Sequence, residues 1–129
     1  MRYFLIFLLL NLGILSARTQ SCDDVMNFVK SKSYGTTYTS YNSTAISKVT
    51  FYEIMIDYQN SYFAIVCFKR KYSYGCTEYI YQVGARTKYN YSINYLSSAG
   101  KAFWKYIQPY HKILGCGPDL DEDLDDDDE

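Results

Sequence analysis

Four cysteines are the residues of this chain best suited to covalent chemistry: Cys22, Cys67, Cys76 and Cys116. A cysteine can form a disulfide, bind zinc as a thiolate, or act as a nucleophile. No Cys-x-x-Cys pair is present, and the only histidine is His111, so the spacing does not favour zinc or a catalytic thiol. We therefore expect two disulfides, no metal and no cofactor.

Three pairings of these cysteines are possible, and the hairpin pattern favours one of them. If residues 61–69 and 75–83 form a hairpin that turns near Lys71-Tyr72, Cys67 and Cys76 lie directly opposite each other. The other two cysteines are then left to pair. Their disulfide would close most of the chain into one loop, which stabilises a fold by roughly 4.7 kcal/mol in the chain-entropy model.

Sixteen tyrosines, interleaved with lysines and arginines, form the second pattern with chemical potential. Aromatic faces can stack on bases or sugars, and neighbouring cations can contact phosphates. The residues that we expect to form such a binding face are Tyr79, Tyr81, Lys69, Arg70, Lys71, Arg86, Lys88 and Trp104. The alternative, which stays open at this point, is that alternating tyrosines mark a half-buried strand with hydroxyl groups at the water edge.

No group of acidic or basic side chains indicates a catalytic site. His111 has no cysteine or carboxylate at a motif spacing, and Glu53, Asp57 and Glu78 are scattered along the sequence. We therefore name no catalytic residue and expect a protein that is not an enzyme.

Residues 1–21 predict export of the chain. Arg2 precedes an apolar run over residues 3–15, which ends at the small pair Ser16-Ala17 and is followed by a short polar spacer up to Ser21. This pattern is typical of a secretory signal peptide. The apolar run is shorter than the roughly 20 residues that a membrane-spanning helix needs. We expect a secreted or periplasmic protein with no stable membrane span after the signal peptide is removed.

The net charge of −1 hides two parts of opposite sign. Residues 22–118 carry eleven Lys or Arg against five acids, whereas nine of the eleven residues from 119 to 129 are acidic. Such a run repels itself and has little to bury, so we expect residues 119–129 to be a disordered tail. The tail either solubilises the protein or screens the basic domain intramolecularly.

Residues 22–118 are expected to form a single domain that begins with a helix and a sheet. Ser21 can cap the first helix, whose apolar residues recur at helical spacing until Tyr34-Gly35. The Thr-, Ser-, Tyr- and Asn-rich segment 36–44 is expected to be extended or irregular. Three β-rich runs follow at about 45–56, 61–69 and 75–83, and the short turns between them predict an antiparallel meander.

The C-terminal part of this domain changes to a helical period. Apolar residues recur every three to four positions on both sides of residues 97–100, which predicts two short helices, the second ending at Pro109. The expected fold class is therefore α+β. It consists of an N-terminal helix, a three-stranded antiparallel β-meander and two C-terminal helices, stapled by disulfides.

Three short sequence motifs occur in order within residues of about 43–110. They are Ser43-Thr44-Ala45-Ile46, the central Tyr79-Ile80-Tyr81, and the helical segment Ser97-Ser98-Ala99-Gly100-Lys101-Ala102-Phe103. In this order they resemble a KTSC domain, a short domain named for its occurrence at the end of some lysyl-tRNA synthetases. The resemblance implies a small β-meander followed by helices, no established enzymatic activity and a suggested role in RNA binding. It supplies no catalytic residue.

Together these patterns predict a small exported domain with a non-enzymatic role in binding or interaction, whose partner is an unknown protein or a polyanion. The alternative function is binding of nucleic acid, RNA in particular, or of another polyanion through the face of tyrosine and Lys/Arg side chains.

Overall fold

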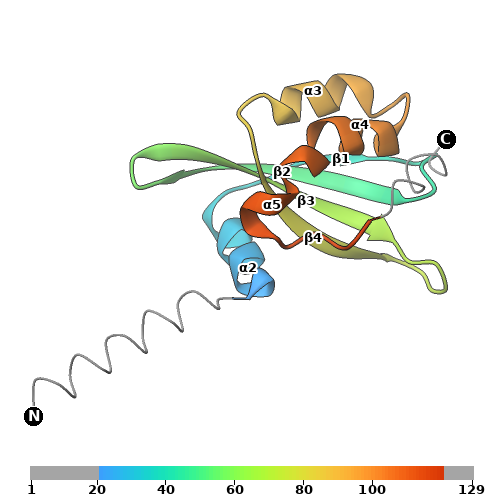
Figure 1. Cartoon of the computed structure of the whole chain (residues 1–129), viewed down its shortest axis with the longest axis horizontal. Helices are drawn as coiled ribbons and strands as arrows, with labels where there is room; N and C mark the ends of the chain where they lie inside the picture. The colour runs from blue at the N-terminus through green and yellow to red at the C-terminus, as the bar shows by residue number, and fades with distance from the viewer. Residues whose placement is uncertain (1–20, 121–129) are drawn as a thin grey trace, which may run out of the picture.

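A four-stranded antiparallel sheet organises the structure, a computed structural model that describes residues 21–120 (Figure 1). The strands lie in the order β1 (Thr36–Thr39), β2 (Ile46–Ile56), β3 (Gln59–Lys69) and β4 (Cys76–Val83). The helices are α2 (Cys22–Lys32), α3 (Thr87–Asn94), α4 (Ala99–Tyr106) and α5 (His111–Leu114), with the 3-10 helix η1 (Gln108–Tyr110) before α5. The α+β class is confirmed. The segments 1–20 and 121–129, which hold most of the predicted signal peptide and tail, lie outside the described residues.

The prediction of three strands is wrong because β1 adds an edge strand to the meander. Its sequence, Thr-Thr-Tyr-Thr, lacks the apolar content that usually indicates a strand. An edge strand needs few apolar side chains, and Tyr38 alone packs against Phe51, with 6.0 Å between the ring centroids. On the opposite face of the sheet, the hydroxyl oxygens of Thr37 and Thr50 lie 2.8 Å apart and link β1 to β2.

Helix α2 begins where the sequence predicts, because Ser21 caps its first turn. The Ser21 hydroxyl accepts a hydrogen bond from the Asp24 N–H at 3.1 Å, which satisfies one of the donors that a helix start leaves unpaired. The helix ends at Lys32, two residues before the expected stop. Val29 is fully buried and places the apolar side of α2 on the sheet.

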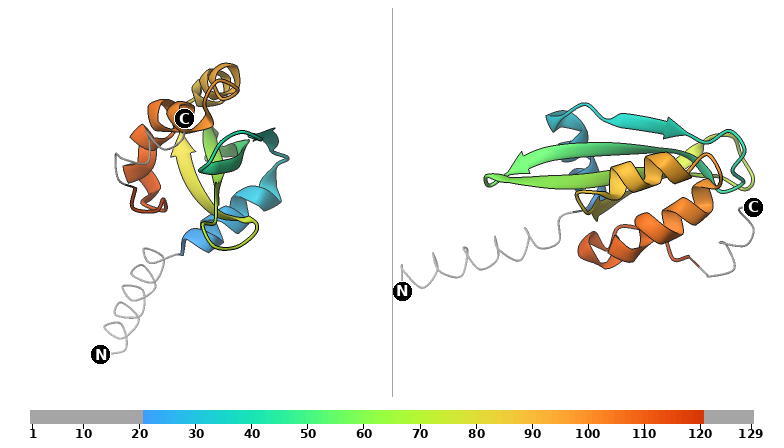
Figure 2. Two further views of the ribbon diagram at one scale, coloured as in Figure 1. Left: turned by 90° about the vertical axis from the view of Figure 1, so that its right-hand side faces the viewer. Right: turned by 90° about the horizontal axis from the view of Figure 1, so that it is seen from above.

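Both faces of the sheet are covered, so the domain has three layers (Figure 2). Helices α3 and α4 pack on one face, around the ring of Phe103. Helix α2 packs on the other face, around Val29. Because successive side chains of a strand point to opposite faces, β3 contributes to both cores and is buried continuously from Phe63 to Cys67.

The chain passes round the edge of β4 after α4 and reaches the α2 face. Leu114 and Cys116 both pack against the cluster on that face. Gly115 permits the turn because it ends α5 with a left-handed φ of 66°, a conformation that favours glycine. At Gly117 the backbone runs so close to β4 that an added Cβ would lie 2.6 Å from the Tyr81 hydroxyl oxygen.

Two disulfides are present, and they pair the cysteines as the hairpin pattern favours. Cys22 and Cys116 lie 5.7 Å apart at Cα and join α2 to the segment after α5. Cys67 and Cys76 lie 5.3 Å apart, but the expectation that they face each other directly is wrong. Cys67 pairs with Glu78 in the ladder and Cys76 with Lys69, because the hairpin is centred on Tyr72-Ser73, one residue later than expected. The disulfide therefore runs diagonally between β3 and β4.

The two ends of the sheet carry different connections, and we name them for these. The loop end holds the β1–β2 loop (residues 40–45), the β3–β4 loop (residues 70–75) and the α3–α4 junction (residues 95–98), as the right view of Figure 2 shows. The hairpin end holds the two-residue β2–β3 turn, Asp57-Tyr58, and the link from β4 to α3 (residues 84–86).

Candidate binding site at the loop end

The β3–β4 loop is held in shape by Arg70 and presents two tyrosines to solvent. The Arg70 N–H donates to the Gly75 carbonyl at 3.2 Å and closes the loop. Its guanidinium donates to the Tyr74 carbonyl and to the Thr77 hydroxyl, each at 3.3 Å. The side chains of Tyr72 and Tyr74 are 98% and 99% exposed, so their rings are available on both faces.

Lys69 connects this loop to the neighbouring β1–β2 loop. Its ammonium group donates a hydrogen bond to the Ser43 carbonyl oxygen, and its backbone N–H donates to the Ala45 carbonyl at 2.7 Å. The two loops are therefore tied together although 26 residues separate Ser43 from Lys69 in the sequence. Lys71 follows directly and is exposed.

An apolar groove of about 390 Å³ lies beside these cations. Phe68 and Tyr79 line it from β3 and β4, with 5.8 Å between their ring centroids. Lys69, Arg70 and Lys71 line it from the loop side. Leu120, the last described residue, also lines the groove, so the described chain ends beside the three cations.

Tyr81 does not belong to an exposed face, although the sequence places it with Tyr79. It is 1% exposed, and its ring meets Phe103 edge-on at 5.6 Å. Helix α4 covers this face of β4, so the strand alternation directs Tyr81 into the core rather than into a ligand site. Burial, together with the nearby Tyr79, raises the pKa of Tyr81 far above its usual value, and its hydroxyl has no hydrogen-bond partner among the described residues.

Of the remaining predicted residues, Arg86 and Lys88 do not join the groove cations in one face, whereas Trp104 lies beside the groove. Arg86 and Lys88 are exposed at the hairpin end, separated from the loop end by the length of β4, which is about 26 Å for its eight residues. Lys88 donates a hydrogen bond to the Thr36 hydroxyl at 3.1 Å. Trp104 is half-buried on α4 and packs edge-on against Phe103 at 6.0 Å, next to a small cavity that Phe68 also lines.

Three exposed tyrosines at the loop end were not among the predicted binding residues. They are Tyr41, Tyr72 and Tyr74, with exposed fractions of 87%, 98% and 99%. The signal that could have found Tyr72 and Tyr74 is their position in a Ser- and Gly-containing turn, where no strand alternation can bury a ring.

The electrostatic environment of the loop end is positive within the described residues. Glu78 lies two positions into β4 from Cys76, but its carboxylate is paired with Lys30 of α2 at 2.7 Å. Asp119 lies next to the groove residues Pro118 and Leu120. The three groove cations are therefore opposed by little negative charge from the rest of residues 21–120.

The described residues form neither a metal centre nor a membrane-spanning helix. Over residues 21–120, no three His, Cys, Asp or Glu side chains come together in a way that could hold a metal ion. Within the same range, every helix is too short or too polar to cross a membrane. All four cysteines are in disulfides.

Comparison with known proteins gives no relative from which a function could be transferred. No family model, no curated protein and no solved structure matches this chain. The interpretation of the loop end therefore depends on its own geometry.

Proposed function

We propose that this protein is a non-enzymatic binding module and that its ligand is a flexible polyanion held at the loop end. The observation that carries this proposal is the contact of three consecutive cations, Lys69, Arg70 and Lys71, with a groove walled by aromatic rings. Cations gain affinity for a polyanion by releasing its condensed counterions, and aromatic rings stack on the bases or sugars between its charges.

The shape of the loop end supports an extended ligand rather than a globular one. Tyr72 and Tyr74 project from the loop, while Phe68 and Tyr79 line the groove below them. A polyanion that crosses the loop end would contact the exposed rings of Tyr72 and Tyr74 first and the groove next. The cations would lie between these rings and the groove. Bracing by Arg70 and by the Cys67–Cys76 disulfide reduces the ordering that binding would require.

The acidic segment 121–129 is proposed to compete with this ligand. The described chain enters the groove with Pro118 and Leu120, and the residues that follow are nearly all acidic. A tethered anion has a high effective concentration near its own domain, so even weak attraction to the groove cations would reduce the affinity for an external polyanion.

We also propose that the protein is exported and that its domain is related to KTSC domains. The two disulfides fit an oxidising compartment, which supports a secreted or periplasmic location. The resemblance to KTSC domains is supported by the order of elements, a β-meander followed by α3 and α4, with Ser98 of the third sequence motif capping α4. The RNA-binding role suggested for that family is one form of the proposed activity.

The proposal is tested by fluorescence anisotropy on residues 18–129 with both disulfides formed. The probes are a single-stranded oligonucleotide and a heparin-derived oligosaccharide of similar charge, which distinguish phosphate from sulfate polymers. We expect Arg70→Gln with Lys71→Gln to weaken binding about tenfold, and to reduce the slope of log affinity against log salt by about 1.4.

The matched control removes the same charge elsewhere, by Lys105→Gln with Lys112→Gln on the exposed sides of α4 and α5. These substitutions should leave the affinity within about twofold of the original, because screened distant charges contribute little. Equal losses in both double variants would reject the loop end as the binding site.

A further inference from the structure

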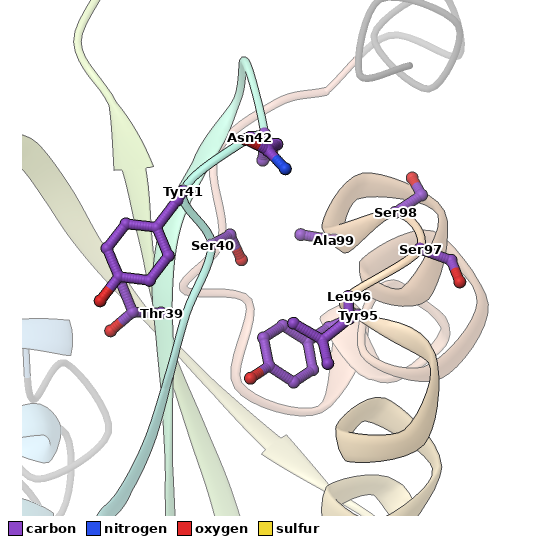
Figure 3. Close-up of a pocket in the computed structure, with 10 residues that line it drawn as sticks. Thr39, Ser40, Tyr41, Asn42, Tyr95, Leu96, Ser97, Ser98 and Ala99 are labelled. Atoms are coloured by element: carbon purple, nitrogen blue, oxygen red, sulfur yellow. The ribbon is translucent and has the colours of Figure 1, made fainter.

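A second cavity, of about 180 Å³, lies on the other side of the β1–β2 loop from the basic groove. It separates that loop from the α3–α4 junction (Figure 3). Its lining differs in kind from that of the groove: hydroxyl and amide side chains predominate, and none of the lining residues is charged. A cavity with this lining suits a ligand that accepts several hydrogen bonds.

Ser40 gives this cavity a hydrogen-bond donor with no partner of its own. Its side chain is 92% buried, since only 8% is exposed, and its hydroxyl has no partner among the described residues. Its backbone N–H is used, because it donates to the Ser47 carbonyl at 2.9 Å. Figure 3 shows the hydroxyl oxygen directed from the strand toward the α3–α4 junction. A buried hydroxyl without a partner is unfavourable, so an acceptor brought by a ligand would stabilise it.

The start of α4 supplies further donors on the opposite wall of the cavity. Ser98 caps this helix by accepting from the Lys101 N–H at 3.1 Å. The N–H groups of Ala99 and Gly100 come earlier in the first turn, where a helix provides no acceptor, and neither has a hydrogen-bond partner in the described part of the chain. Ala99 lines this cavity, whereas Gly100 lines the small cavity beside Trp104. Both residues are buried, and the helix dipole favours negative charge at this point.

We propose that this cavity binds a tetrahedral oxyanion, the phosphate or sulfate group of a ligand. The Ser40 hydroxyl would donate from the β1 side and the Ala99 N–H group from the start of α4, so the oxygens of the anion are met from two sides. The Asn42 side chain leans into the same gap and completes the set of donors (Figure 3). The absence of a carboxylate from the lining means that nothing in the cavity repels the anion.

This site is separate from the basic groove, and the two proposals can fail independently. The oxyanion site uses neutral donors, whereas the groove uses cations. Arg70→Gln with Lys71→Gln should therefore leave oxyanion binding in the cavity unchanged. If the polyanion proposal is correct as well, an end group of the polymer could reach this cavity across the β1–β2 loop.

The test is an NMR titration of ¹⁵N-labelled residues 18–129, with both disulfides formed, using inorganic phosphate and inorganic sulfate in separate series at constant ionic strength. We expect saturable shifts of the Ser40 and Ala99 amide signals. Saturation by both anions would indicate that the cavity recognises any tetrahedral oxyanion. Saturation by only one of them would identify the group of the ligand as phosphate or as sulfate. No saturable shift with either anion would overturn the proposal.

Ser40→Ala should weaken this binding by about tenfold, because it removes a hydrogen bond to a charged group. The matched control is Ser92→Ala on α3, whose hydroxyl donates to the Tyr89 carbonyl at 2.7 Å away from the cavity, and we expect no change in affinity. If Ser40→Ala does not fold, Asn42→Ala at an exposed position provides the second variant, with an expected loss of about threefold. If the variant that is measured binds the anion with unchanged affinity, the anion does not bind in this cavity.

Discussion

The loop end and the hairpin end of the sheet both carry cations and tyrosines, yet only one of them has the features of a binding site. At the loop end, Lys69, Arg70 and Lys71 line a groove with no acidic residue among its lining. At the hairpin end, Lys88 lines a pocket of about 160 Å³ together with Glu53. The difference teaches that the number of cations matters less than whether the fold places an acid beside them.

The two ends also differ in how the backbone is held. The loop end depends on side chains and sulfur: Arg70 braces one loop, Lys69 joins it to the next, and a disulfide crosses the strands below. The β2–β3 turn at the hairpin end depends on its backbone, with Asp57 and Tyr58 both at positive φ, 51° and 66°, in a two-residue turn. A tight turn of this kind fixes the strand register.

The largest expected effect separates the two disulfides. Replacing Cys22 and Cys116 by serine opens a loop of 94 residues and should lower the free energy of unfolding by about 4.7 kcal/mol, whereas replacing Cys67 and Cys76, 9 residues apart, should lower it by about 2.7 kcal/mol. Urea denaturation followed by circular dichroism measures both values.

Removal of the Cys67–Cys76 disulfide should cost less stability but should reduce polyanion affinity more, because only this disulfide lies below the β3–β4 loop. Polyanion affinity measured under conditions where both variants are folded tests this. A greater loss of affinity in the variant without Cys22 and Cys116 would contradict the assignment of binding to the loop end.

Charge reversal compares the two ends directly. Arg70→Glu with Lys71→Glu should reduce polyanion affinity by about a hundredfold, because two contacts with the polymer become repulsive. Arg86→Glu with Lys88→Glu makes the same change of charge at the hairpin end and should reduce polyanion affinity by less than about threefold. Anisotropy titrations at one salt concentration measure both, and equal effects would remove the distinction between the ends.

Removal of residues 121–129 should raise polyanion affinity by about tenfold at low salt, with the gain shrinking as salt increases. The control is a chain of the same length in which the acids of this segment are replaced by serine and glycine. If the neutral segment lowers affinity as much as the acidic one, the effect is steric, and electrostatic competition is wrong.

The hairpin turn offers a smaller and opposite effect. Asp57→Asn with Tyr58→Gly provides the residues that suit positive φ at both positions and should increase the free energy of unfolding by about 1 kcal/mol. Polyanion binding should not change, since this turn lies at the other end of the sheet. A change in affinity without a change in stability would give the hairpin end a role that its geometry does not indicate.

Tyr81→Phe should have the smallest effect near neutral pH and should leave polyanion affinity unchanged. Its pKa is raised by burial, so above a pH of about 10 the unfolded chain releases this proton while the folded chain keeps it. Wild-type stability should therefore fall with rising pH more steeply than that of Tyr81→Phe. Equal slopes in alkaline urea titrations would mean that the Tyr81 hydroxyl is not buried in solution.

The features that the sequence predicts well are those set by neighbours along the chain. The Ser21 cap, the run of buried residues in β3 and the break between two helices near residues 97–100 each depend on a few consecutive residues. β1 was missed because its stability comes from pairing with β2 and from one ring, Tyr38, rather than from its own composition.

The candidate site was harder to predict because it depends on contacts between distant segments. Strand alternation correctly places Tyr79 and Tyr81 on one face of β4, but nothing local shows that α4 covers Tyr81 and leaves the edge of Tyr79 beside the groove. Arg86 and Lys88 follow β4 closely in sequence, and only the strand direction carries them to the opposite end. The Ser40 cavity, likewise, forms only when the β1–β2 loop meets the start of α4.

The Cys22–Cys116 disulfide has one further consequence, for how the chain responds to proteolytic cleavage. A single cut at an exposed tip, such as Tyr58 or Tyr72, would leave two fragments still joined covalently through α2 and the segment after α5. The fragments also share one sheet and two cores, so the nicked molecule would keep its loop end assembled. The loop closed by Cys22 and Cys116 therefore does not prevent cleavage but keeps the cleaved protein assembled.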